Sequence, residues 1–142
     1  MTDDKHDQTA LQPWMRPLLI FAGIFNVLAG SCMIVFYHEG YKLLGIPRPE
    51  VVLPVQVMGI LVALFGVGYL LVAKNPLENR HILALGFWSK ALSSALAIAY
   101  VFNGELPLVL LPIVIFSDVI YLPPFYMILR IIYRQADQAQ HN

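Results

Sequence analysis

The sequence predicts an all-α protein that crosses a membrane as a four-helix up-and-down bundle with a kinked fourth helix. Hydrophobic residues make up 58% of the 142 residues and charged residues only 13%. A soluble domain carries about 25% charged residues, so an ordinary soluble protein is excluded. The mean hydropathy is +0.68, and four long apolar stretches follow one another along the chain. A formal net charge of zero, without a basic run, argues against a nucleic-acid partner.

Each apolar stretch is long enough to cross the hydrocarbon core, which requires about 20 residues of helix. The stretches are residues 17–37, 51–73, 82–102 and 106–129. The first two carry no charge, the third carries only Lys90, and the fourth carries only Asp118. Strands in lipid would have to close a barrel to satisfy their backbone groups, so helices are expected. We predict a single transmembrane domain over residues 17–130, with polar cytoplasmic tails over residues 1–16 and 131–142.

The connections between the stretches and the distribution of positive charge predict the topology. Short loops place consecutive helices side by side and antiparallel. Six Lys and Arg side chains belong to one side of the membrane, and only Lys42 and Arg48 to the other. The six are Lys5, Arg16, Lys74, Arg80, Arg130 and Arg134. Because the cytoplasmic side carries the excess, we expect both termini in the cytoplasm, with the lipid bilayer as the partner of the chain.

The first span is too long for the apolar region of a signal peptide, about 7–15 residues, and follows an acidic segment, so cleavage is not expected.

Small residues recur at helical spacing in three spans, and close packing at such residues drives helix association in lipid. The series are Ala22, Asn26 and Gly30; Gly59, Ala63 and Gly66; and Ala91, Ala95 and Ala99. Each is expected to be a packing stripe or one wall of a cleft for a lipid-like ligand. Cys32 cannot form an intrachain disulfide and is expected to be buried.

The fourth span should be irregular, because Pro123 and Pro124 stand inside it. Proline lacks a backbone donor and clashes with the preceding turn, so this pair is expected to kink or break the helix. Asp118 lies within two turns before the double proline. We expect a cavity beside this carboxylate.

Lys90 and Asp118 are the charges inside the predicted spans. Each lies 14 residues from Gly104, the turn of the last hairpin, so both should lie at the same depth, about 21 Å from the turn. A lone charge there costs about 2.5–3.5 kcal/mol, which an ion pair can offset. The side chains expected to form a polar network with the pair are Asn26, Tyr121 and Ser94, while Gln56 is a candidate polar residue nearer the outer side. The pair either fixes helix register or forms a proton-titrating or ligand-binding site.

Catalytic and metal-binding patterns are missing from the sequence. The four histidines lie in tails or at span ends, which argues against haem ligation inside the membrane. There is no HExxH pattern and no cluster of carboxylates with histidine, so neither a metal nor another cofactor is expected. No catalytic residue is identified, and the sequence favours a protein that is not an enzyme.

Three strings of residues carry a family resemblance. They are Gly66-Val67-Gly68-Tyr69 with Asn75-Pro76; Leu85-Gly86-Phe87-Trp88-Ser89-Lys90; and Phe116-Ser117-Asp118-Val119-Ile120-Tyr121-Leu122-Pro123-Pro124-Phe125. The chain resembles small bacterial four-span membrane proteins of the DoxX-like type, which place a similar Asp, aromatic and double-proline string in the last span. The resemblance implies that the chain lies in the bacterial inner membrane. Some of these relatives are linked to thiol or quinone oxidation, and the single Cys32 argues against thiol chemistry here.

Two classes of function fit these observations. The first is a non-enzymatic membrane component: an accessory subunit with a membrane-protein partner or in a homo-oligomer, or a binder of a lipid-like or quinone-like molecule. The second is a small proton-coupled transporter that uses a buried Lys90–Asp118 pair. An intramembrane enzyme ranks third.

Overall fold

The computed structural model describes residues 11–140, and the described part of the chain is all-α. Within it 80% of residues are helical and no strand occurs. Four helices are long and apolar enough to cross a membrane: α1 (Met15–Val35), α3 (Leu53–Lys74), α4 (Arg80–Phe102) and the bent last helix (Leu110–Gln140). The predicted fold class is confirmed. Most of the predicted N-terminal tail, including Lys5, lies outside the described residues, as do residues 141–142.

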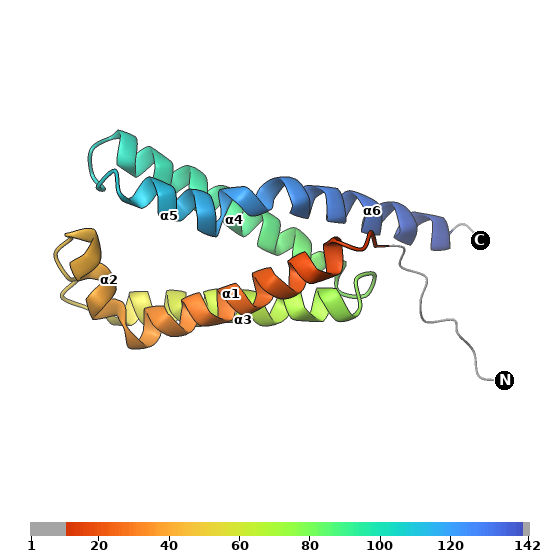
Figure 1. The fold of residues 1–142 in the computed structure, drawn as a ribbon, viewed down its shortest axis with the longest axis horizontal. Coiled ribbons are helices and arrows are strands. Elements are labelled where there is room, and N and C mark those ends of the chain that lie inside the picture. The colour runs from red at the N-terminus through yellow and green to blue at the C-terminus, as the bar shows by residue number, and fades with distance from the viewer. Residues whose placement is uncertain (1–10, 141–142) are drawn as a thin grey trace.

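The four spans run up and down (Figure 1). The start of α1, the α3–α4 connection and the end of the last helix lie at one end of the molecule, which we call the tail end. The opposite end, which we call the loop end, holds the short helix α2 (Tyr37–Leu44) and the turn after α4. Gly45 ends α2 and Gly104 follows α4. Both have a positive φ (66° and 78°), a left-handed backbone conformation that glycine adopts without a steric penalty.

Helices α1 and α3 pack with their backbones in direct contact. Gly23 and Gly30 of α1 oppose Gly66 and Gly59 of α3. A Cβ on Gly59 would lie 2.7 Å from the Gly30 carbonyl oxygen, and one on Gly66 would lie 2.6 Å from the Gly23 carbonyl oxygen. Only glycine allows so close an approach, so these four residues form a glycine seam. The packing stripes predicted for the first two spans are therefore confirmed at Gly30, Gly59 and Gly66.

Two sequence expectations about helix faces are wrong. Ala95 and Ala99 of the third stripe are exposed, and α4 instead turns Gly86 and Lys90 inward. Cys32 is also exposed rather than buried. The reason is that an outward face in lipid is as apolar as an inward one, so the spacing of small residues does not set the rotation of a helix.

The fourth span is divided into α5 (Leu110–Ser117), a 3₁₀ turn η1 (Val119–Tyr121) and α6 (Leu122–Gln140). The last helix is bent by 26°, which confirms the predicted kink. Helix α6 continues through most of the predicted C-terminal tail, because its last turns contain neither proline nor glycine and are rich in residues such as Ala, Arg and Gln that favour helix.

The break lies in the turn that precedes Pro123 and Pro124. These prolines cannot donate to the carbonyls four residues earlier, and their rings crowd that turn. The turn tightens, and the Tyr121 N–H donates to the Asp118 carbonyl at 3.1 Å. In a continuous α-helix the same N–H would bond to the carbonyl of Ser117. The Ser117 carbonyl is thereby released from helix bonding.

The apolar core lies toward the tail end, where all four spans meet. Its members come from α1, α3, α4, η1 and α6, and the largest fully buried side chains among them are Tyr69 and Phe125. These two rings meet edge to face, with 5.0 Å between their centroids. Toward the loop end, the α1–α3 pair diverges from the α4–α5 pair (Figure 1), and α5 packs mainly against α4. The molecule is thus closed at the tail end and divided at the loop end.

Large apolar side chains cover the outside of every span. Phe21, Leu64, Leu92 and Phe116, one from each span, are all more than half exposed. A soluble monomer rarely carries such extended apolar patches, whereas a lipid-facing surface requires them. The surface is that of a multi-pass membrane protein.

Candidate functional site

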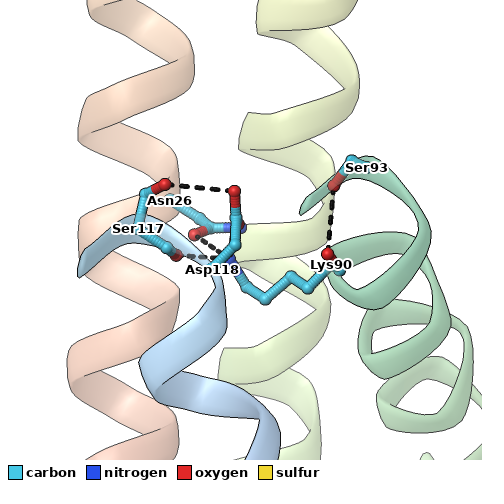
Figure 2. Close-up of polar contacts among 5 residues, drawn as sticks. All are labelled: Asn26, Lys90, Ser93, Ser117 and Asp118. Atoms are coloured by element: carbon cyan, nitrogen blue, oxygen red, sulfur yellow. Dashed lines mark hydrogen bonds and ion pairs between the residues drawn. The ribbon is translucent and has the colours of Figure 1, made fainter. Parts of the chain in front are cut away.

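The two intramembrane charges form an ion pair between α4 and the helix break. Lys90 Nζ lies 2.7 Å from Asp118 Oδ1 (Figure 2). The equal depth predicted from the distances to Gly104 is therefore accompanied by helix rotations that turn the two side chains toward each other. The Lys90 side chain is 6% exposed and that of Asp118 is 26% exposed. The pair is thus buried on the ammonium side and accessible on the carboxylate side.

Three oxygens surround the Lys90 ammonium group. It donates to Asp118 Oδ1 at 2.7 Å, to the Ser117 carbonyl at 2.8 Å and to Asn26 Oδ1 at 3.5 Å. The Ser117 carbonyl is available because the helix break has released it. The Tyr121 ring lies 5.2 Å from Nζ and adds a cation–π contact. Since an ammonium group has three N–H donors, the protein itself satisfies Lys90 completely.

Asp118 keeps unused acceptor capacity. Its Oδ1 accepts from Lys90, and its Oδ2 accepts from the Ser117 hydroxyl at 3.0 Å. A carboxylate has about four lone-pair sites, so side chains within residues 11–140 occupy about half of them. The remaining acceptor capacity therefore belongs to a side chain that is partly exposed.

A cleft of about 450 Å³ opens over the ion pair, between the α1–α3 pair and the α4–α5 pair. Its polar lining consists of Asn26, Ser89, Lys90, Ser93, Ser117 and Asp118. Its apolar lining includes Phe25, Ala29, Met33, Met58, Val62, Phe65 and Ile113. Tyr69 belongs both to this lining and to the apolar core, so the core closes the cleft toward the tail end. A volume of this size is typical of small-molecule sites, which range over about 300–1,000 Å³.

The structure brings some of the predicted network residues to the pair and leaves others outside it. Asn26 and Tyr121 contact Lys90. Ser94 is 3% exposed, and its Oγ has no hydrogen-bond partner within residues 11–140. Gln56 donates to the Ile34 carbonyl at 3.5 Å and so links α3 to α1 rather than joining the network.

Sequence reasoning missed the role of Ser117, which contributes its carbonyl to Lys90 and its hydroxyl to Asp118. The double proline is the signal that could have drawn attention to released carbonyls nearby. It also missed the aromatic wall residues Phe65 and Tyr69, since nothing in an apolar span distinguishes a residue that lines a cleft from one that faces lipid.

The histidines in the described part of the chain lie near the two ends of the bundle. His38 Nδ1 contacts Arg48 Nη1 at 2.6 Å at the loop end, and His81 Nδ1 contacts the Tyr133 hydroxyl at 3.0 Å at the tail end. Residues 11–140 contain no group of three His, Cys, Asp or Glu side chains that could hold a metal ion.

A second, apolar pocket of about 480 Å³ lies under α2 and shares Met33 with the cleft.

Comparison of the chain with protein-family models, with curated proteins and with solved structures gives no match. The resemblance to DoxX-like proteins therefore stays a prediction made from the sequence.

Proposed function

We propose that the protein binds a lipid-like or quinone-like molecule in the cleft over Lys90 and Asp118. The observation that carries this proposal is a cleft that is lined by the Lys90–Asp118 ion pair and is closed at one end by the apolar core. An apolar molecule could enter from the membrane, place its chain against the apolar lining and direct a polar group toward the pair.

The partial exposure of Asp118 favours a ligand site over a purely structural pair. A charge held inside the membrane is costly, and a pair that only joins two helices does not require a cavity beside one of its groups. Here the ammonium group is enclosed, whereas the Asp118 side chain is 26% exposed and lines the cleft. An intramembrane charge that lines a cavity is a functional-site candidate.

The same proposal includes the cellular setting. We propose that the protein is a DoxX-like accessory component of the bacterial inner membrane, with both termini in the cytoplasm. Support comes from the three sequence strings that carry the resemblance and from the Lys and Arg excess at the tail end, where Arg16 lies in the first turn of α1 and Lys74 ends α3.

Mass spectrometry of gently extracted protein tests ligand binding. The wild-type protein should carry a copurified apolar molecule, and Ala29→Phe should lose it, because Ala29 lines the cleft and the larger ring would fill it. Leu28→Phe is the matched control, since Leu28 is 61% exposed on the outer face. Equal adducts in both variants, or none in the wild type, would contradict the proposal.

A proton-coupled transporter is a second candidate, favoured by a different observation. The helix break places the Asp118 carboxylate at a bend in the span, accessible from the cleft and closed off from the tail end by the core. Protein reconstituted in vesicles should then dissipate a pH gradient, and Asp118→Asn should abolish the flux. A flux no greater than that of protein-free vesicles would exclude this candidate. Four spans would usually need a second copy to enclose a path, so a strictly monomeric protein would also count against it.

A further inference from the structure

The hydrogen bonds of the ion pair limit the chemistry of the ligand that the cleft can take. Among residues 11–140, Lys90 is the only cation that lines the cleft, and its three N–H groups are directed at Asn26, Ser117 and Asp118. A carboxylate, phosphate or carbonyl group of a ligand would have to displace one of these oxygens before Lys90 could donate to it. Such a displacement would break up the network that stabilises the ammonium group inside the membrane.

Asp118, by contrast, can accept further hydrogen bonds from a ligand. It accepts from Lys90 and from Ser117, and the rest of its lone-pair capacity lies on a side chain that is 26% exposed beside the cleft. A carboxylate lone pair that is removed from water without a donor costs free energy. The polar group that best complements this side of the pair is therefore a hydrogen-bond donor.

The charge of the site decides between neutral and charged donors. Lys90 and Asp118 are the only charged residues that the described part of the chain contributes to the lining, and together they are neutral. An anionic ligand would approach an anionic oxygen, and a cationic ligand would leave one uncompensated positive charge in a medium of low dielectric constant. A neutral hydroxyl group supplies the donor without either penalty.

We infer that the cleft selects an apolar molecule that carries a neutral hydroxyl group, which donates to Asp118 while the apolar lining of the cleft holds the chain. This inference rests on the proposed function and narrows its ligand class. Hydroxyl groups of this kind occur on lipid alcohols and on the reduced, hydroquinone form of quinones, whereas the oxidised quinone carries acceptors alone.

Matched probes that differ only in the donor test the inference. Hexadecanol should bind the purified protein at least about tenfold more tightly than hexadecyl methyl ether, because the ether lacks the O–H that bonds to a charged acceptor. Palmitate should bind no more tightly than the ether. A decyl hydroquinone and its oxidised quinone form the second arm, and the hydroquinone should bind more tightly if the natural source is a quinol. Native mass spectrometry titrations would give each Kd.

Three variants test whether the Asp118 carboxylate itself accepts the hydroxyl group of the probe. Ser117→Ala retains the backbone carbonyl and the ion pair but removes the hydroxyl from Asp118 Oδ2, so the alcohol-to-ether ratio should be maintained or increased. Asp118→Asn should reduce the ratio, because an amide oxygen is a weaker acceptor. Ala29→Phe should weaken every probe. If Asp118→Asn does not fold, the alcohol-to-ether ratios of Ser117→Ala and of the wild-type protein still test whether the Asp118 carboxylate accepts the hydroxyl group.

The outcomes distinguish the inference from the proposed function. If alcohol and ether bind equally tightly, or if palmitate binds best, the hydroxyl inference is overturned while ligand binding stands. A ratio that falls to one in Ser117→Ala would assign the contact to the serine and also overturn the inference. If no probe binds the wild-type protein, the proposed function itself fails.

Discussion

Lys90 is stabilised at mid-membrane by oxygens that come from α1, from the end of α5 and from the helix break. No single helix could supply this set, so the buried ammonium group links elements that are otherwise far apart in sequence. Removing one charge would leave the other without its partner in a medium that solvates charges poorly.

The effect on stability of removing one charge should therefore depend on whether the other charge is present. Lys90→Met and Asp118→Leu should each lower the free energy of unfolding by about 3–5 kcal/mol, and the double variant should lose much less than the sum of the two. Unfolding in mixed micelles with an increasing fraction of denaturing detergent measures this. Additive losses would show that the pair contributes no interaction energy, and full ligand binding by the double variant would assign the pair a structural role alone.

The contact between Lys90 and Asp118 could be anticipated from sequence, because equal distances from Gly104 place the two residues at one depth. The role of Ser117 could not, because its carbonyl becomes available only when the turn before the prolines tightens. Asn26 was anticipated as a polar residue of the right depth, whereas the buried but unbonded Ser94 shows that depth and polarity do not determine contact.

At the scale of elements, the glycine seam holds α1 and α3 so close that side chains would separate them. A Cβ on Gly30 would meet the Gly59 carbonyl oxygen, which belongs to a helix backbone and cannot rotate away. By contrast, a Cβ on Gly40 of α2 meets nothing within 4 Å.

These two glycines provide a matched test of the seam. Gly30→Ala should destabilise the protein by about 1–3 kcal/mol through overpacking. Gly40→Ala should be neutral or stabilise the protein by up to about 1 kcal/mol, because alanine favours helix. Thermal unfolding in detergent compares the two. Equal effects would mean that the seam does not depend on the missing side chain.

The helix break can be tested by restoring the donors that proline removes. Pro123→Ala with Pro124→Ala should extend the helix through η1, reduce the bend and raise the protection of amides around residues 119–124 in hydrogen exchange. Pro112→Ala is the control, since Pro112 lies in the first turn of α5, where proline is tolerated. If protection does not change in the double variant, the Lys90–Asp118 pair rather than the prolines maintains the break.

The elements themselves were predictable because long apolar stretches with at most one charge have few alternatives in lipid. The rotation of α4 was not, as the exposed Ala95 and Ala99 show. The kink was predictable from Pro123 and Pro124. It lies one turn before them, at η1, because a proline disturbs the hydrogen bond to the carbonyl four residues earlier.

At the scale of the whole molecule, packing is uneven along the membrane normal. All four spans meet in the core at the tail end, whereas the two helix pairs diverge toward the loop end and leave the cleft between them (Figure 1). Four spans in sequence were enough to predict the up-and-down order. The divergence was not predictable, because it depends on which spans pack closely together, and the sequence does not show that the glycines of α1 and α3 oppose each other.

Labelling with a membrane-impermeant maleimide tests the orientation. In a Cys32→Ala background, Asn103→Cys should react in intact cells, while Gln138→Cys should react only after the membrane is opened, because these sites belong to the loop end and the tail end. The reverse pattern would place the tail end outside the cell.

The equal depth of Lys90 and Asp118 also determines how the protein responds to the membrane potential. A unit charge carried across the full potential gains or loses about 2.3 kcal/mol per 100 mV. A pair of opposite charges at one depth feels almost no net force, and a neutral hydroxyl ligand adds none. Voltage should therefore leave occupancy of the cleft unchanged, whereas a proton that passed from Asp118 across the closed tail end would be driven by the same voltage.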